Sequence, residues 1–91
     1  MALTFEWDPV KAATNLAKHG ISFELAATAF GDPLSLTIPD PKHSQVENRF
    51  ILLGKPRADL IVVVVHVERG DRIRIISARR ANRKERMTYG P

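Results

Sequence analysis

The stretch LIVVVVHVERGDRIRIIS, residues 60–77, contains the centre of the predicted sheet. Its first eight residues are apolar apart from one histidine, as expected for a central strand that is buried on both faces. A hairpin turn follows, because Gly70 supplies the backbone freedom that a tight turn needs. In the return strand, charged and apolar residues alternate, which places Arg72 and Arg74 on the same face.

Further strands are predicted on the N-terminal side of this hairpin. Alternation of apolar residues predicts a strand at residues 3–7, and shorter runs predict strands at residues 34–38 and 49–53. The glycine and proline between residues 54 and 59 predict a turn-rich connection. Residues 39–48 are polar and predict a loop.

Two helices are predicted between the first two strands. Asp8 followed by Pro9 is a typical helix start, and Gly20 is a typical helix end. Ser22 is placed to cap the second helix, which is expected to end at Gly31. The residues of the first helix that are predicted to face the core are Val10, Ala13, Leu16 and Ala17.

A short final helix is predicted to begin at Asn82, because Asn82 and Glu85 have the spacing of a capping box. The element order is therefore β–α–α–β–β–β–β–α. This order predicts an α+β fold, with two N-terminal helices packed on a mainly antiparallel sheet and a short C-terminal helix. The whole chain, residues 1–91, is expected to form a single domain.

Positive charge is concentrated near the end of the chain. Residues 69–86 contain seven Arg and one Lys against two acidic residues, a sum of 8 − 2 = +6, whereas the whole chain sums to +4. Arginine makes forked, planar contacts with phosphate, so this segment favours a polyanionic partner such as nucleic acid. A solvated surface that only maintains solubility is the alternative interpretation.

Composition also bears on the compartment. The chain has no cysteine, so it has neither a disulfide framework nor a thiolate metal site. The N-terminus lacks the basic start and apolar stretch of a signal peptide, and the run at residues 60–65 is too short to cross a bilayer. We therefore expect a cytoplasmic protein that does not enter a membrane.

Three segments of the chain resemble the BrnT family of toxins. FEWDPVKAATNLAKHGISFELAATAFGDP, residues 5–33, resembles the opening of that family, and RIRIISARRANRKERMTYG, residues 72–90, resembles its closing strand and helix. Between them, His43-Ser44 followed by Glu47 and Arg49 matches the middle signature of the family. The three matches occur in the same order and spacing over nearly the whole chain.

The resemblance implies a RelE-like fold and a bacterial type II toxin that cleaves RNA and thereby inhibits translation and growth. It also implies neutralisation by a BrnA-type antitoxin with a ribbon-helix-helix DNA-binding part. The toxin–antitoxin complex would repress its own operon by binding operator DNA through the antitoxin. Two toxins and two antitoxins would form a heterotetramer.

A metal-independent ribonuclease needs a base for the ribose 2′-OH, a donor for the leaving 5′-oxygen and cations for the transition state. The three histidines fall on three different predicted elements, and no metal-ligand spacing is visible, so we expect neither a metal nor another cofactor. His43, Glu47, Arg49 and Arg79 are the predicted catalytic residues. Arg72, Arg74 and Arg80 are the predicted RNA-binding residues.

Each assignment has a structural alternative. His43 could be a solvated loop histidine, and Glu47 with Arg49 could be an ordinary surface ion pair. Arg72 and Arg74 could bind an acidic antitoxin segment instead of RNA, or both in turn. The predicted roles of the other residues are structural: a core position for His66, and a helix C-terminus for His19.

Two further residues have open assignments. Trp7 is expected in the core, with base stacking as the weaker alternative. Tyr89 either packs the final helix or reaches the active site. For the whole protein, the alternatives to a ribonuclease are a catalytically inactive RelE-like binding module, which binds RNA or acts as a corepressor, and a protein whose arginine face docks an acidic partner.

Overall fold

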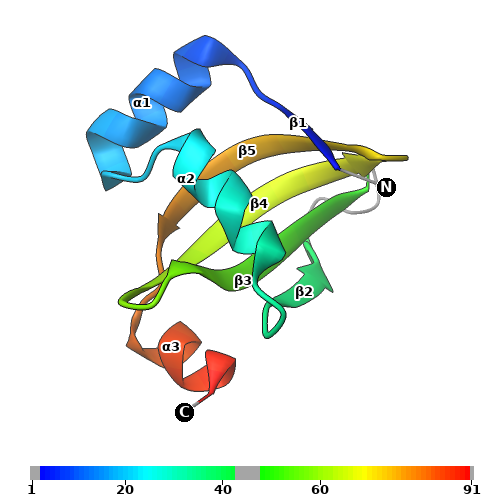
Figure 1. Ribbon diagram of the computed structural model, residues 1–91. Helices are drawn as coiled ribbons and strands as arrows, with labels where there is room; N and C mark the ends of the chain where they lie inside the picture. Colours follow the sequence, from blue (N-terminus) through cyan, green and yellow to red (C-terminus); the bar gives the residue numbers. More distant parts are fainter. Residues whose placement is uncertain (1–2, 43–47, 91) are drawn as a thin grey trace.

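The computed structural model describes residues 3–42 and 48–90. A five-stranded sheet forms its centre, with two helices on one face and a third helix near the other (Figure 1). The elements are β1 (Thr4–Glu6), α1 (Pro9–His19), α2 (Phe23–Thr28), the 3₁₀ turn η1 (Ala29–Gly31), β2 (Leu36–Pro39), β3 (Arg49–Arg57), β4 (Leu60–Arg69), β5 (Arg72–Arg80) and α3 (Arg83–Tyr89). This order confirms the predicted α+β fold.

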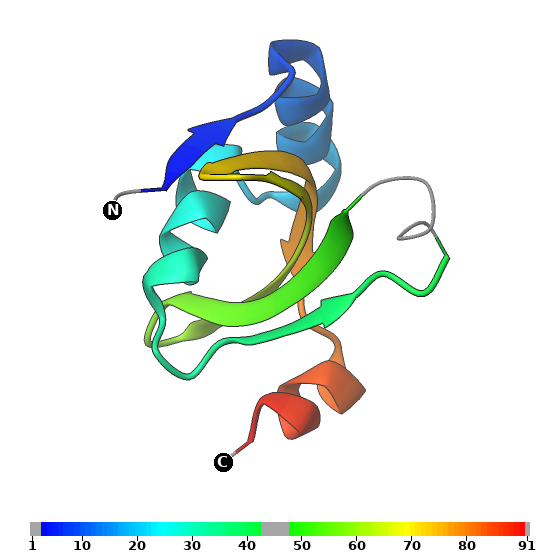
Figure 2. The ribbon, with the colours of Figure 1, turned by 90° about the vertical axis from the view of Figure 1, so that its right-hand side faces the viewer.

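The strands lie in the order β1-β5-β4-β3-β2. All neighbouring strands are antiparallel except β1, which pairs with β5 in parallel. The sheet is strongly curved, and Figure 2 shows α2 on one side of it and α3 below it, next to β2. We call the face covered by α1 and α2 the helix face, and the opposite face the open face.

The helix boundaries follow from local capping. The side chain of Asp8 accepts a hydrogen bond from the Val10 backbone N–H at 2.9 Å, and Ser22 accepts one from Leu25 at 3.0 Å. Gly20 ends α1 with a φ of 72°, a left-handed conformation that favours glycine. In α3, Asn82 and Glu85 form the predicted capping box.

The main core lies between the helix face and the helices. Its buried members come from α2 and η1, from Ile21 just before α2, and from β3, β4 and β5. Trp7 packs edge-on against Phe23, with ring centroids 6.0 Å apart, which confirms its predicted place in the core. A smaller cluster on the open face joins Leu53, Val63 and Ala81 to Tyr89 of α3, so β4 is buried from both sides as predicted.

The prediction for the buried face of α1 was wrong. Val10 is 73% exposed and Leu16 is 49% exposed, and both alanines of the predicted face are exposed too. The buried residue of α1 is Asn15, at 7% exposure. The helix has this orientation because the Asn15 side chain bonds the backbone of β5, a contact that the apolar pattern does not reveal.

The strand ends also differ from the predicted boundaries. β3 continues through Gly54 to Arg57, and β5 continues to Arg80, so neither extension is a loop. Gly54 is required by close packing and not by a turn, because a Cβ there would lie 3.1 Å from the Ala29 carbonyl oxygen. A register shift between Gly54 and Arg57 accommodates the irregular end of the strand.

Candidate nucleic-acid interface

Arg49 and Arg74 lie in one row across the open face. In the strand register, Val67 of β4 is opposite Arg49 of β3 on one side and opposite Arg74 of β5 on the other. Directly opposed residues project to the same face, and neighbouring strands are about 4.8 Å apart, so the two arginines begin about 10 Å from each other. Val67 between them is only 2% exposed.

Arg72 lies next to this row, and Glu6 joins it to Arg74. The Glu6 carboxylate lies 3.6 Å from Nε of Arg72 and 3.3 Å from Nη1 of Arg74. All three residues are on the open face, because Phe5 between Thr4 and Glu6 packs into the core on the other side. Arg72, Arg74, Glu6 and Arg49 therefore form one group at this end of the sheet, which we call the arginine cluster.

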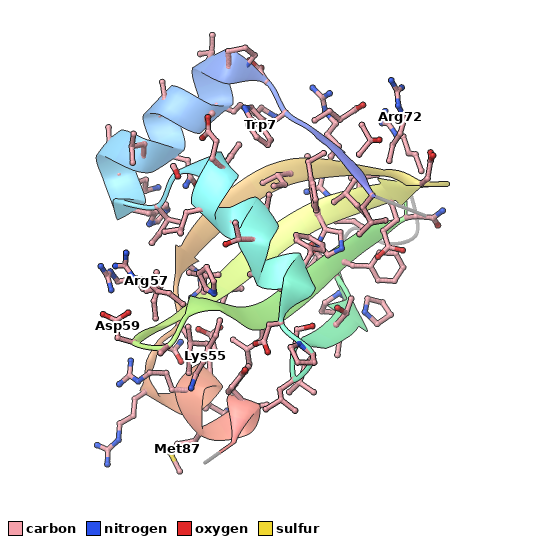
Figure 3. The ribbon with its side chains drawn as sticks, viewed as in Figure 1. Trp7, Lys55, Arg57, Asp59, Arg72 and Met87 are labelled. Atoms are coloured by element: carbon pink, nitrogen blue, oxygen red, sulfur yellow. The ribbon has the colours of Figure 1, made fainter. Side chains whose placement is uncertain are left out.

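Figure 3 shows Arg72 at the end of the sheet opposite to Arg57 and Asp59, which lie at the β3–β4 turn. Arg79 of β5 also lies toward that far end. It is five residues beyond Arg74 along the strand, a distance of about 17 Å. The structure therefore does not bring Arg79 into the arginine cluster.

Arg79 is bound to α3 instead. Its two terminal nitrogens donate to the two carboxylate oxygens of Glu85, each at 2.8 Å. This forked contact raises the pKa of Arg79, and the hydrogen bond from Arg79 holds the pKa of Glu85 below its usual value. Arg80 is exposed and lies opposite Val62, whose side chain belongs to the helix face, so Arg80 and Arg79 project to opposite faces.

The predicted catalytic residues His43 and Glu47 lie outside the described residues. The described residues on either side of them are anchored beside the arginine cluster. The Asp40 backbone N–H donates to the Arg49 carbonyl at 2.9 Å, and the Glu68 N–H donates to the Asn48 carbonyl at 2.9 Å. Asp40 and Asn48, which are described on either side of residues 43–47, therefore both lie at the end of the sheet that carries Arg49.

His66 and His19 lie where they were predicted, in the core and at the C-terminus of a helix. His66 is fully buried between Phe30 and Phe50, with ring centroids 4.8 Å and 6.0 Å away. Its Nε2 lies 3.3 Å from the Glu68 carboxylate. His19 is in the last turn of α1, where a cation would complement the helix dipole.

Tyr89 packs α3 against the open face and also binds Asp32, a contact that was not predicted. Its hydroxyl donates to the Asp32 carboxylate, which also accepts from the Leu34 and Lys55 backbone N–H groups at 2.9 Å and 2.8 Å. This arrangement raises the pKa of Tyr89 to about 12 and lowers that of Asp32. Asp32 follows a glycine and precedes a proline, a pattern that predicts only a turn.

Two further properties of the described residues concern ligands and membranes. Within residues 3–42 and 48–90, no three His, Cys, Asp or Glu side chains are grouped so that they could hold a metal ion. None of the helices in the same ranges is both long and apolar enough to cross a membrane.

Comparisons with known proteins agree with the fold. The crystal structure of the Brucella abortus ribonuclease toxin BrnT, solved at 1.1 Å resolution, is similar with a TM-score of 0.71 and 24% sequence identity. The alignment covers 90% of this chain and all of that one. A comparison with curated proteins finds no match.

The model of one family covers most of the chain. It is described as the ribonuclease toxin BrnT of type II toxin–antitoxin systems, and it matches residues 7–85. The match includes α1, α2, the whole sheet except β1, and the beginning of α3. The chain therefore belongs to the BrnT family of ribonuclease toxins of type II toxin–antitoxin systems.

Proposed function

We propose that this protein is an endoribonuclease that cleaves cellular RNA without a metal ion and so arrests translation and growth. The observation that carries the proposal is the row Arg49–Val67–Arg74, with Arg72 beside it. Three guanidinium groups at one end of a curved sheet can bind the phosphates on either side of a ribose and stabilise charge that develops on one of them.

The proposed reaction is an internal transfer of the phosphoryl group. A base removes the proton from the ribose 2′-OH, and the 2′-oxygen attacks the adjacent phosphorus. The bond to the 5′-oxygen breaks, and that oxygen takes a proton from a general acid. The products are a 2′,3′-cyclic phosphate and a free 5′-hydroxyl, so the reaction needs no additional reactant.

The roles are assigned from the chemistry of each residue and, for the arginines, from their positions. His43 and Glu47 supply the base and the acid, since imidazole and carboxyl groups are common general acids and bases in enzymes. Arg49 and Arg74 bind the phosphate that is attacked, and Arg72 binds a neighbouring one. Arg79, which lies toward the far end of β5 on the open face, binds the same RNA chain at a distance from the cleaved bond. Arg80 projects to the helix face and is given no role on this path.

The proposed partners are those that the resemblance to the family implies. We propose that a BrnA-type ribbon-helix-helix antitoxin covers the arginine cluster in the cytoplasm and thereby blocks cleavage. Two toxins and two antitoxins form a heterotetramer, and this complex binds operator DNA through the antitoxin and represses the operon. Occlusion of the cluster explains neutralisation most directly, because RNA phosphates and acidic side chains compete for the same guanidinium groups.

One observation favours the alternative, a RelE-like module that binds RNA or acts as a corepressor without cleaving. Glu6 already engages Arg72 and Arg74, and Glu85 engages Arg79. Carboxylates in these positions reduce the positive charge available to a transition state. The two functions differ in one result, because only the ribonuclease produces cyclic-phosphate ends from purified RNA.

The deciding experiment is cleavage of purified RNA in excess EDTA. The wild type should cleave, and Arg49→Ala and His43→Ala should each reduce kcat by about 10²-fold or more. Arg57→Ala is the matched control, since Arg57 is an exposed arginine at the opposite end of the sheet. An inactive wild type supports the binding module. Cleavage that depends on added Mg²⁺ contradicts the metal-free mechanism, and full activity of Arg49→Ala, Arg79→Ala and His43→Ala contradicts the site.

A further inference from the structure

A second group of cations lies beside the outer edge of β5. It lines a shallow groove between α1 and the middle of that strand, at some distance along β5 from the arginine cluster. We call this feature the α1 groove. Its lining residues are Val10, Lys11, Thr14, Asn15, Lys18, His19, Ile76 and Ser77.

The spacing along α1 places both lysines at this groove. Lys11, Asn15 and Lys18 are at positions i, i+4 and i+7, so they lie along one stripe of the helix, with one lysine a turn before Asn15 and the other a turn after it. The two lysines are about 10 Å apart along the helix axis. They can therefore contact different groups of an extended ligand.

Asn15 holds the helix, and with it both lysines, at a defined place on the sheet. Its amide nitrogen donates to the Ala78 carbonyl at 2.8 Å and to the Ile21 carbonyl at 3.0 Å, and its oxygen accepts from the Ala78 N–H at 3.1 Å. These contacts use the whole side chain for structure. Asn15 thus positions the groove but is not available to bind a ligand.

A bulge in β5 opens the groove toward the open face. Val65 is opposite Ser77 and His66 is opposite Ile75, so Ile76 is an extra residue in β5. A bulge of this kind bends a strand and redirects its side chains.

Ser77 connects the α1 groove to the open face. It lies in a row with Val65 on that face and also lines the groove. The groove therefore meets the open face between Arg74 and Arg79.

The charge around the groove differs from that of the arginine cluster. No acidic residue lines it, and within the described ranges neither Lys11 nor Lys18 has a carboxylate partner. By contrast, Arg72, Arg74 and Arg79 each contact a glutamate. The two ammonium groups, with the hydroxyls of the lining Thr14 and Ser77 nearby, form a site for anions with little competition from the protein itself.

We infer that the α1 groove binds the phosphates of a single-stranded RNA, so that one RNA chain runs along β5 between the arginine cluster and Arg79. The inference rests on the proposed function, since it extends the binding site of the same substrate. A single RNA chain that follows β5 can contact the arginine cluster first, then Lys11 and Lys18 of α1, and then Arg79. An acidic peptide is the less suitable ligand, because the groove offers only Val10 and Ile76 to the apolar side chains that anchor peptides.

The test measures binding of a short single-stranded 2′-O-methyl RNA, which cannot be cleaved because its 2′-oxygen carries no proton. The double variant Lys11→Ala/Lys18→Ala is compared with Arg83→Ala/Lys84→Ala, which removes the same charge from exposed positions of α3. Loss of two phosphate contacts should weaken binding about tenfold and reduce the salt slope by roughly 1.4. The control variant should retain the wild-type slope, and Lys11→Arg/Lys18→Arg should restore it.

Each other result has a defined meaning. If the lysine and control variants lose affinity equally, the groove makes no specific contact and the inference is overturned, while the proposed function stands if the wild type cleaves RNA. If the lysine variant loses binding to poly-L-glutamate but keeps RNA binding, the groove serves an acidic protein and the inference is again overturned. If the wild type neither binds nor cleaves RNA, the proposed function fails first. Thermal unfolding of each variant checks that the fold is unchanged.

Discussion

The side-chain amide of Asn15 in α1 pairs with the backbone of Ala78 in β5 as a neighbouring strand would. It bonds both the N–H and the C=O of Ala78, although the two residues are 63 positions apart. β1 pairs with β5 only as far as Arg74, so the edge of β5 beyond that point has no strand partner in the described residues. A single side chain therefore satisfies the outward backbone groups of the buried Ala78 and attaches α1 to the sheet.

Replacement of Asn15 should destabilise the fold more than any other single change in α1. Asn15→Ala leaves the buried N–H and C=O of Ala78 without partners, which costs about 2–4 kcal/mol of unfolding free energy. Urea unfolding followed by circular dichroism measures this difference. Thr14→Ala, at an exposed neighbouring position, should change stability by no more than about 0.5 kcal/mol. Equal stability of the two variants would contradict the proposed role of Asn15.

Tyr89 offers a direct test of the contact between α3 and the rest of the protein. It is the only tyrosine of the chain, so a titration of tyrosinate absorbance reports this residue alone. The hydrogen bond to Asp32 raises the pKa of Tyr89 to about 12, from an ordinary value of 10.0. We expect a midpoint near 12 in the wild type and one closer to 10 in Asp32→Asn.

The sign of the effect on stability follows from the direction of the Tyr89 shift. A pKa that is raised in the folded state stabilises the protein fully below the ordinary value of 10.0 and loses its effect as the pH rises through about 12. Tyr89→Phe should therefore destabilise the protein at neutral pH and lose this difference at high pH. A wild-type midpoint near 10 would show that the Asp32 contact is absent in solution.

The contact between Arg79 and Glu85 should weaken in acid. Arg79 holds the pKa of Glu85 below its ordinary value of 4.5, so the contact stabilises the fold above that pH and loses its effect as the pH falls through the lowered value. Both side chains are partly exposed, so the expected contribution is on the order of 1 kcal/mol. Unfolding measured from neutral to acidic pH should show a smaller decline in Glu85→Gln than in the wild type.

Glu6 should compete with RNA for Arg72 and Arg74. Its carboxylate contacts both guanidinium groups, so Glu6→Gln releases them and should raise affinity for single-stranded RNA by up to about fivefold at low salt. Glu24→Gln is the matched control, because Glu24 is an exposed glutamate of α2 and its loss changes the net charge equally. If both variants gain affinity to the same extent, the effect is one of overall charge and Glu6 has no local role.

Most of the fold could be predicted because its signals are local. A cap such as Asp8, a terminator such as Gly20 and the capping box of Asn82 and Glu85 act on backbone groups within one helical turn. The predicted ends of β3 and β5 were less accurate. Gly54 marks close packing against Ala29, a residue distant in sequence, and not a turn.

The candidate site could be predicted only in part. The repeated arginines indicated a surface for polyanions, and the alternation correctly placed Arg72 and Arg74 on one face. The separation of Arg79 from this pair could not be predicted, because it depends on the length of β5 and on the position of α3. Lys11 and Lys18 were not predicted as ligand contacts, since the apolar pattern of α1 indicated a different buried face.

The sequence by itself determined the order of the elements, the helix caps, the central buried strand and the membership of the chain in its family. These features depend on each residue and its near neighbours. Only the tertiary structure decided that Asn15 faces the sheet, that Arg49 and Arg74 share a row, and that glutamates engage the arginines. The physical reason is that strand register and side-chain pairing join residues that are far apart in the chain, and the energies of such contacts leave no periodic pattern in the sequence.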